Sequence, residues 1–382
     1  MSTTIKTTEP LEINFSEFDE YIRQGEPDQR EKAGIWSVAI GLQQVDGLQT
    51  SDFLRQTARR NIEGEISIDE ARKVVREYYV SKSQHEAVNE DEQEADRVSA
   101  NIAAILRSKT FNFSTLGYTS VHRRIFDGVM KHAGELRKYD ITKKEWVLQG
   151  DTVLYLNWED LRMALDYDLA QEKQFSYIGL SSDDMIAHLT KFVSGLWQIH
   201  AFPEGNTRTT AVFTILYLRS LGWQVDNGMF AKHAWYFRNA LVRANYHNVQ
   251  KNIDYTFTYL ERFFRNLLLG EAWDLRSRYL HIAAPEEWRG QPQITEKTSA
   301  QSITEKDSKS QFDTLGLSLE ERMILSAIAS DPYLKQQQMT ELIHKSIATV
   351  KRITINLQER GLLRRENGKR NGKWLLGKEV KL

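Results

Sequence analysis

Apolar residues recur every three to four positions along most of the chain, which is the spacing of one face of an α-helix. Only six prolines interrupt the 382 residues. Together these features predict a mainly α fold. The pattern is clearest in seven segments, at residues 68–82, 98–108, 121–137, 158–173, 185–200, 209–223 and 255–270.

The exception lies at residues 140–155, where two short β-forming runs, KEWVL and TVLY, flank Gln149, Gly150 and Asp151. Strand formers on both sides of a Gly-containing turn predict a β-hairpin. Because an isolated hairpin is not stable in water, we expect it to lie on the helical part of the protein.

The composition changes at residues 291–313, which are rich in Ser, Thr, Gln and Lys and have no apolar period. Such a composition is typical of a linker. Beyond it, three helical patterns precede two strand-like runs, GLLRRE and KWLLG, around a basic turn rich in Gly and Asn. This order of elements predicts a winged helix-turn-helix domain at residues 315–382.

The C-terminal segment is basic: residues 315–382 hold 13 Lys and Arg against 7 Asp and Glu, although the whole chain has a net charge of -1. Lys and Arg on such a domain can neutralise the phosphates of DNA. The alternative is a winged helix used for protein contact or packing, with a solvated basic face. The candidate DNA-binding residues are Lys351, Arg352, Arg365, Lys369, Arg370 and Lys373.

The composition excludes several classes of site. The sequence has no cysteine, so it has no disulfide, thiolate zinc site or cysteine nucleophile. It has no run of about 18 apolar residues and no basic, apolar start, so neither a membrane span nor a signal peptide is indicated. We therefore expect a cytoplasmic protein without a membrane partner. A homodimer is left open.

The segment HAFPEGNTRTT, residues 200–210, joins two apolar helical patterns and gathers side chains suited to phosphate chemistry. His200 can accept a proton near neutral pH. Arg208 and the free N–H groups at the start of the second helix would bind an anion, and Gly205 lets the backbone approach an oxygen closely. Glu204 suits this anionic site if it holds Mg²⁺ against the phosphates. These parts predict the attack of a hydroxyl on a nucleotide phosphate.

The same segment resembles the signature HxFx[DE]GNxR of Fic-domain proteins, which usually transfer AMP from ATP to a Ser, Thr or Tyr hydroxyl of a target protein. The resemblance spans roughly residues 100–282. It implies a Fic-type helical core in which the hairpin at residues 140–155 is a flap that binds the target segment as an added strand. The residues that match the signature are His200, Phe202, Glu204, Gly205, Asn206 and Arg208.

The resemblance also implies a role for each matching residue. His200 would be the general base, and Glu204 would hold Mg²⁺. Gly205 and Asn206 would bind phosphate oxygens, while Arg208 would neutralise the β-phosphate of ATP.

Three further residues have roles implied by the family. Phe202 would anchor the phosphate-binding loop in the core. Tyr236 and Asn239 lie in the position of the family's adenosine-facing helix, so they are candidates for nucleotide contact.

The sequence departs from the common continuation GNGRxxR at two positions. Thr207 replaces the glycine, and Ala211 replaces the second arginine, which holds the γ-phosphate in the family. A side chain at position 207 would crowd the anion site, and a lysine there accompanies phosphoryl transfer in the Doc branch. Because threonine is smaller and uncharged, we favour AMP transfer. The alternatives are a phosphotransferase, another nucleotidyl transferase, and a nucleotide-sensing DNA-binding regulator.

The N-terminal segment resembles the small antitoxins of the VbhA type, whose inhibitory helix ends in Glu-Gly and pairs with the second arginine. Asp46-Gly47 ends one helical pattern, and the run GEISIDEA begins 18 residues after Asp46. Glu63-Gly64 is a second degenerate match, and a plain helix C-terminus at Gly47 is the alternative. Because Asp46 replaces a glutamate and Ala211 an arginine, we predict weak or absent autoinhibition of the usual kind.

These observations divide the chain into four parts: an N-terminal antitoxin-like helical segment, a Fic catalytic domain, a linker and a winged helix, at residues 1–95, 96–285, 286–314 and 315–382.

Overall fold

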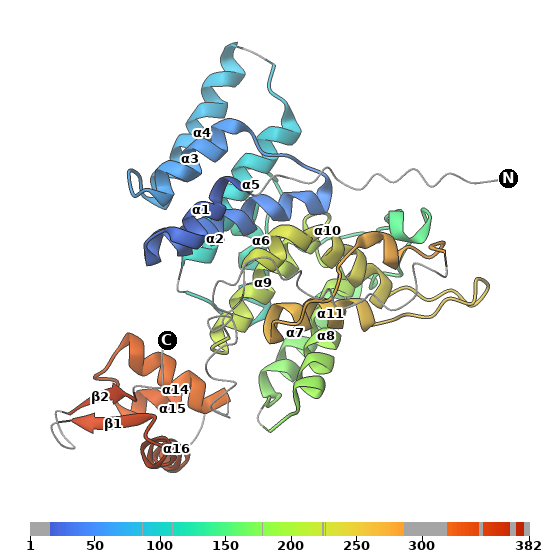
Figure 1. The fold of residues 1–382 in the computed structure, drawn as a ribbon. Coiled ribbons are helices and arrows are strands. Elements are labelled where there is room, and N and C mark those ends of the chain that lie inside the picture. Colours follow the sequence, from blue (N-terminus) through green and yellow to red (C-terminus); the bar gives the residue numbers. More distant parts are fainter. Residues whose placement is uncertain are drawn as a thin grey trace. The chain divides into compact units, whose positions relative to one another are not determined.

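The computed structural model describes residues 16–85, 87–108, 110–177, 179–223, 225, 227–285, 319–343, 347–366 and 372–377 (Figure 1). The chain divides into two compact units. The first comprises residues 1–174, 186–217 and 225–295, and the second comprises residues 175–185, 218–224 and 296–382. The predicted segments 1–95 and 96–285 therefore lie mostly in one unit.

The mainly α fold that the sequence predicts is confirmed, because helices account for most of the described residues. No helix in the described part of the chain has the length and hydrophobicity of a membrane span. Up to residue 285 the α-helices are α1 (Ser16–Gln24), α2 (Pro27–Gly41), α3 (Asp52–Ile62), α4 (Ile68–His85), α5 (Glu90–Arg107), α6 (Thr115–Ile125), α7 (Leu161–Gln174), α8 (Ser182–Ile199), α9 (Asn206–Ser220), α10 (Asn227–Ala244) and α11 (Thr258–Leu269). The 3₁₀-helices are η1 (Leu42–Asp46), η2 (Trp146–Leu148), η3 (Trp158–Asp160) and η4 (Ser277–Leu280).

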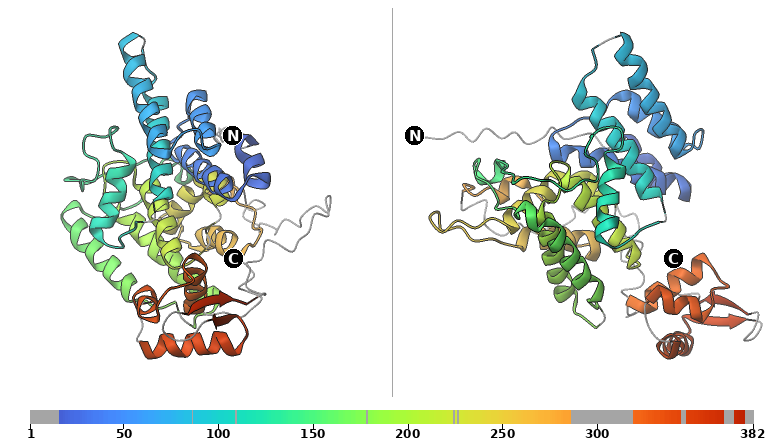
Figure 2. Two further views of the ribbon diagram at one scale, coloured as in Figure 1. Left: turned by 90° about the vertical axis from the view of Figure 1, so that its left-hand side faces the viewer. Right: turned by 180° about the vertical axis from the view of Figure 1, so that it is seen from behind.

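Helix α9 lies inside the first unit (Figure 2). Every residue from 206 to 218 is buried. The polar residues of its first turns are buried together with the apolar side chains that follow, so no face of this stretch is left to water. The central helix therefore gives the loop in front of it a rigid support.

Helix α2 packs against α5 and α10 and so joins the N-terminal segment to the rest of the first unit. All residues from Ala33 to Gly41 are buried. A Cβ atom on Gly41 would lie 2.3 Å from the carbonyl oxygen of Ala231, so only glycine allows this approach of α2 to α10. The chain continues through η1 and turns at Gly47, which has a φ of 73°. The close packing fixes η1 against the core.

The predicted helix at residues 121–137 ends early, at Ile125. Turns follow it, and Gly128 and Gly134 take positive φ angles of 73° and 84°. The apolar period therefore continues through a turn region in which the chain leaves the helix.

The predicted hairpin at residues 140–155 was wrong in its secondary structure, because no strand is present there. One backbone pair, from the N–H of Glu145 to the carbonyl of Asp151 at 2.9 Å, closes a loop that contains η2. Gln149 has a φ of 56°, and Val147 and Leu148 are fully buried. Packing of these side chains onto the helices outweighs the local strand propensity.

The second unit contains α14 (Leu319–Ser330), α15 (Gln336–Ile343), α16 (Ile347–Glu359), β1 (Leu363–Glu366) and β2 (Lys373–Leu376). The two strands are antiparallel, with Leu363 opposite Leu376. The helices and strands of this unit share a core that includes Ile324, Met339, Val350, Leu357 and Trp374. This is the order of elements that the sequence predicts, and its assignment as a winged helix stays a prediction.

Candidate functional site

His200 begins the loop between α8 and α9, and its backbone is held in an unusual conformation. Its φ is 50°, in the left-handed region that costs free energy for a residue with a side chain. The buried guanidinium group of Arg137 donates from Nε to the carbonyl of His200 at 2.8 Å and from Nη2 to that of Leu156. The backbone N–H of Arg137 donates to the carbonyl of Ala201 at 2.9 Å. Arg137 therefore fixes the loop at His200.

The imidazole ring of His200 is buried, yet neither ring nitrogen has a hydrogen-bond partner in the described chain. Its ring centre lies 4.0 Å from that of Tyr155 and 5.2 Å from that of Trp197. Burial lowers the pKa of His200 well below its ordinary value, and the positive charge of Lys143 lowers it further. The ring is therefore neutral at pH 7, which leaves one nitrogen able to accept a proton.

The backbone of the loop is closed by side chains that face inward. The amide of Asn206 accepts from the N–H of Phe202 at 2.9 Å and donates to its carbonyl at 2.7 Å. His122 stacks on Phe202 with ring centres 3.8 Å apart. Its Nδ1 accepts from the N–H of Gly134, so its Nε2 donates to the carbonyl of Glu204. Burial lowers the pKa of His122 to about 4, which keeps this hydrogen-bonding arrangement at neutral pH.

Two positions next to the helix N-terminus depend on close packing. Gly205 has a φ of 72°, and a Cβ atom there would lie 2.2 Å from the Cζ atom of Phe126. The hydroxyl of Thr207 accepts from the indole N–H of Trp197 at 2.9 Å. The side chain of Thr207 is therefore directed toward α8. It does not point into the anion site, where the sequence led us to expect crowding.

The side chain of Glu204 is exposed at the edge of the same loop. Among the described residues, no group of three His, Asp or Glu side chains is placed to hold a metal ion. Magnesium commonly binds one or two carboxylates together with substrate phosphates and water, so a single exposed carboxylate fits this ion when a nucleotide supplies the other oxygens.

Arg208 lies in the first turn of α9 and is only 2% exposed. Its Nε lies 2.8 Å from Oδ2 of Asp46, while Nη1 donates to Gln43 at 3.0 Å and Nη2 to Glu94 at 2.7 Å. Its other side faces the ring of Phe126, with a distance of 4.8 Å to the ring centre. Gln43 of η1 and Glu94 of α5 therefore hydrogen-bond to the two terminal nitrogens of the guanidinium group, whereas Asp46 pairs with Nε by charge and makes no hydrogen bond to it.

A sequence profile of the Fic/DOC family matches residues 113–218, which include this loop, the whole of α8 and most of α9. The chain contains a Fic/DOC family domain. Among curated proteins, none matches the sequence.

Solved structures that are similar to the chain include two Fic proteins. One is the N-terminal Fic domain of an effector protein from Bartonella sp. AR 15-3, with 19% identity, a TM-score of 0.36, and coverage of 46% of this chain and 82% of that one. The other is a Fic family protein from Desulfovibrio desulfuricans G20, with 12% identity, a TM-score of 0.37 and full coverage of both chains.

Tyr236 and Asn239, the two residues of α10 that were predicted to contact the nucleotide, are both buried. The hydroxyl of Tyr236 donates to the carbonyl of Tyr259 at 3.1 Å. The side-chain nitrogen of Asn239 donates to the carbonyl of Trp235, and its oxygen has no partner among the described residues. Asn239 thus keeps a free acceptor, whereas the hydroxyl of Tyr236 is already engaged.

Arg238 on α10 connects this helix to η1 and to the segment at residues 140–155. Nη2 of Arg238 lies 2.9 Å from a carboxylate oxygen of Glu145, at the start of the 140–155 segment. Its Nη1 donates to the carbonyl of Val45 at 2.9 Å. Arg238 therefore binds both η1 and the segment that the sequence predicts as the flap.

The remaining predicted residues lie elsewhere. Gly47 ends η1 directly after Asp46, whereas Glu63 caps the end of α3 and accepts from the hydroxyl of Tyr21. In the second unit, Lys351 and Arg352 are exposed on α16. Arg365 stacks on Trp374 and Lys373 lies 3.4 Å from Glu366. Lys369 and Arg370 lie outside the described residues.

Several residues that shape the Fic loop were missed by sequence reasoning. His122 and Arg137 lie within the predicted helical segment 121–137, and the apolar period gave neither of them a role at the site. Phe126, Gln43 and Glu94 carried no signal, because each acts through a contact with a residue far away in the sequence.

Proposed function

We propose that the protein transfers AMP from ATP to a Ser, Thr or Tyr hydroxyl of a target protein. The observation that carries this proposal is the ring of His200, which is neutral, has no hydrogen-bond partner among the described residues, and is fixed in the loop that precedes the N-terminus of α9. A general base needs a free lone pair and a defined position, and His200 has both.

In this mechanism His200 accepts the proton of the target hydroxyl as its oxygen attacks the α-phosphorus of ATP. The new O–P bond forms while the bond to the β-phosphate oxygen breaks, and pyrophosphate leaves. The first N–H groups of α9 face the phosphates, and the backbone at Gly205 permits their close approach. Mg²⁺ held by Glu204 would neutralise phosphate charge.

Arg208 would neutralise the charge of the phosphates once its contacts with Asp46 and Glu94 are broken. The carboxylates of Asp46 and Glu94 bind the nitrogens that a phosphate would need, so these acids compete with the nucleotide. In the family, the inhibitory glutamate pairs with an arginine at the position of Ala211, which is buried in this chain. The prediction of weak or absent autoinhibition of the usual kind therefore stays, and we propose in addition an inhibitory contact of another kind, which acts on Arg208 itself.

The target protein would dock on the segment at residues 140–155. Leu154 in this segment is 83% exposed, and Tyr139 just before it is 55% exposed. The side chain of Gln198 donates to the carbonyl of Leu154 at 2.6 Å, which ties the segment to the end of α8 close to His200. Exposed apolar side chains at this place favour contact with a protein chain.

Parallel incubations of a cell lysate with ATP labelled at the α- or the γ-phosphate, both with Mg²⁺, test the proposal. We expect α-labelled ATP, and not γ-labelled ATP, to give label on protein that is lost with His200→Ala. Label from γ-labelled ATP that is lost with His200→Ala would instead support phosphorylation. The direction of Thr207 toward Trp197 favours the first outcome, since the side chain leaves the phosphate site uncrowded.

For the second unit we propose DNA binding through α16, because Lys351 and Arg352 are adjacent and exposed there. Arg365 and Lys373 contact neighbours within the unit and are weaker candidates. Replacement of both Lys351 and Arg352 by Gln should weaken the binding of duplex DNA and reduce its salt dependence. A protein that shifts no DNA in low salt, or a double variant that binds as the parent does, would favour a role in protein contact.

A further inference from the structure

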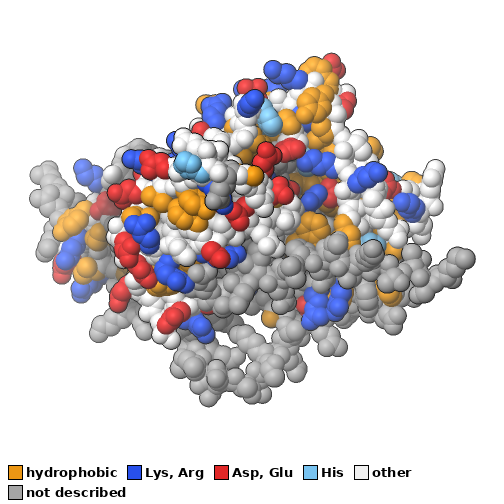
Figure 3. All heavy atoms as spheres, turned by 90° about the horizontal axis from the view of Figure 1, so that it is seen from above, with side chains coloured by type: hydrophobic (Ala, Val, Ile, Leu, Met, Phe, Trp, Pro, Cys, Tyr) orange, Lys and Arg blue, Asp and Glu red, His pale blue; other side chains and the backbone are white. Residues whose placement is uncertain are grey.

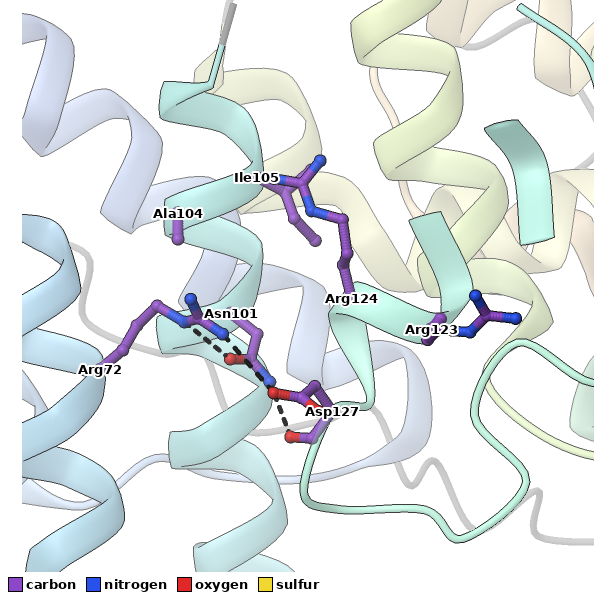
Figure 4. A pocket seen from close by; sticks show the side chains of 7 residues that line it. All are labelled: Arg72, Asn101, Ala104, Ile105, Arg123, Arg124 and Asp127. Carbon is purple, nitrogen blue, oxygen red and sulfur yellow. Dashed lines mark hydrogen bonds and ion pairs between the residues drawn. The ribbon is translucent and has the colours of Figure 1, made fainter. Parts of the chain in front are cut away.

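A pocket between α4, α5 and α6 has three arginines among its seven lining residues (Figure 4). On the face shown in Figure 3, acidic and basic side chains of the described residues are interspersed. The pocket has a volume of about 240 Å³. Its lining residues are Arg72, Asn101, Ala104, Ile105, Arg123, Arg124 and Asp127.

A smaller pocket of about 50 Å³ adjoins the first and shares Arg72, Asn101 and Asp127 with it. It adds Arg76 and Arg97 to the lining. We call the two together the arginine pocket. Five arginines thus line it, and Asp127 is the only acidic residue in either lining.

Asp127 is shared between two of these arginines. Its Oδ2 lies 3.7 Å from Nη2 of Arg72 and 3.5 Å from Nη2 of Arg76. Asn101 accepts from Nε of Arg72 at 3.0 Å and donates to the carbonyl of Asp127 at 3.1 Å. One carboxylate cannot neutralise the pocket, because both of its neighbours already use the same oxygen.

The other arginines lack an acid in the pocket. Figure 4 shows bonds that join Arg72, Asn101 and Asp127, whereas none of the lining residues bonds to Arg123 or Arg124. Burial lowers the pKa of Arg124, and the nearby charge of Arg72 lowers it further. Nε of Arg97 is buried without a hydrogen-bond partner in the described chain. Uncompensated charge at a partly buried site favours the binding of an anion.

We propose that the arginine pocket binds the pyrophosphate group of a small molecule. Guanidinium groups bind phosphate oxygens in pairs, and several of them around one cavity suit a ligand with more than one phosphate. The volume is below the roughly 300 Å³ at which drug-sized ligand pockets begin, so the phosphates would fill most of it. Ala104 and Ile105 offer a short apolar wall to anything attached to them.

The pocket is distinct from the Fic loop but adjoins it through one residue. Asn101 donates to the carbonyls of Ile125 and Asp127, which flank Phe126. The ring of Phe126 packs beneath Gly205 and faces Arg208. A ligand in the arginine pocket would therefore bind beside the residue that supports the loop.

Titration calorimetry of the full chain with inorganic pyrophosphate and with ADP tests this proposal. Arg124→Met should weaken binding about tenfold or more, because it removes charge-assisted hydrogen bonds. Asp127→Asn should strengthen binding several-fold. Arg162→Met is the matched control, since Arg162 is an exposed arginine that pairs with Asp166 on α7. Thermal unfolding of each variant checks that it folds.

The two ligands separate the sources of the pyrophosphate group. Equal affinities would indicate a site for the free anion, and tighter binding of ADP would indicate a nucleotide; both outcomes support the pocket. Arg208→Gln distinguishes it from the Fic loop and should retain this binding. The proposal is overturned if neither ligand binds, if Arg124→Met binds as the parent protein does, or if only Arg208→Gln abolishes binding.

Discussion

Nε of Arg208 lies 2.8 Å from Oδ2 of Asp46, so a residue of the N-terminal segment occupies the arginine of the Fic loop. Gln43 and Glu94 bind the other two nitrogens. Because Gly41 allows α2 to pack directly on α10, η1 is held at the distance that these contacts need. The N-terminal segment thus belongs to the site as well as to the core.

Removal of the Asp46 charge should raise the proposed transferase activity. Asp46→Asn keeps the size of the side chain but weakens its hold on Arg208, and we expect the rate of label transfer to rise roughly five- to tenfold, within the usual range of coupling between sites. The matched control is Asp52→Asn, an exposed acid of the same segment that pairs with Arg55. An Asp46→Asn rate equal to that of the control would show that this contact does not restrain the site.

Arg137 should act on catalysis through the position of His200. Arg137→Lys retains the charge but cannot reach the carbonyls of His200 and Leu156 together. We expect kcat to fall at least about tenfold, with a smaller change in KM for ATP, because misplacement of a base affects the chemical step. Steady-state kinetics at 25 °C measure both values. A change confined to KM would assign Arg137 to nucleotide binding instead.

Gly205 should tolerate no side chain. In Gly205→Ala the new Cβ meets the ring of Phe126 at 2.2 Å and the residue keeps a φ of 72°, so we expect a loss of about 2 to 4 kcal/mol in the free energy of unfolding. Gly150→Ala is the control, since Gly150 also has a positive φ but nothing within 4 Å of its Cβ position. The control should lose about 1 kcal/mol from backbone strain alone.

A double variant isolates the clash in Gly205→Ala. If the clash with Phe126 dominates, Gly205→Ala with Phe126→Leu should be less destabilised than the sum of the two single variants, by about 1 kcal/mol. Urea unfolding measures all four proteins of this cycle. Strict additivity would mean that the ring is not the obstacle.

Stability should decrease in mild acid because His122 is buried as a neutral ring. The unfolded chain binds a proton below about pH 6.5, whereas folded His122 binds one only near its pKa of about 4. The unfolded state therefore gains protons first, and the free energy of unfolding falls as the pH drops. Between pH 7.5 and 5, His122 should account for a loss of about 2 kcal/mol.

Unfolding of His122→Gln at both pH values measures this contribution. The variant should show a smaller acid effect than the exposed control His247→Gln. If both variants lose stability to the same extent between the two pH values, another group is responsible for the acid sensitivity.

The sequence predicted the parts of the site that are adjacent along the chain. Residues from His200 to Arg208 share one loop, so their spacing alone indicates their proximity and their chemistry. The supports could not be predicted in this way. His122 and Arg137 act on the loop from other helices and turns, and only the fold brings their side chains to its carbonyls.

The errors have a common physical origin in long-range packing. The 140–155 segment has strand-forming residues, but burial of Val147 and Leu148 and a left-handed Gln149 produce a 3₁₀ turn. Asp46 was one candidate for the inhibitory position, but its contact with Arg208 was not predicted, because the family pairs this position with an arginine that is absent here.

The mass added to a protein target by the wild-type chain, compared with His200→Ala, tests the central claim most directly. After incubation with ATP and Mg²⁺, mass spectrometry of the labelled protein should find one adenylyl group on a Ser, Thr or Tyr residue, and none with His200→Ala. Asp46→Asn should increase the modified fraction. An equal yield from His200→Ala, or a phosphoryl group in place of the adenylyl group, would contradict the account.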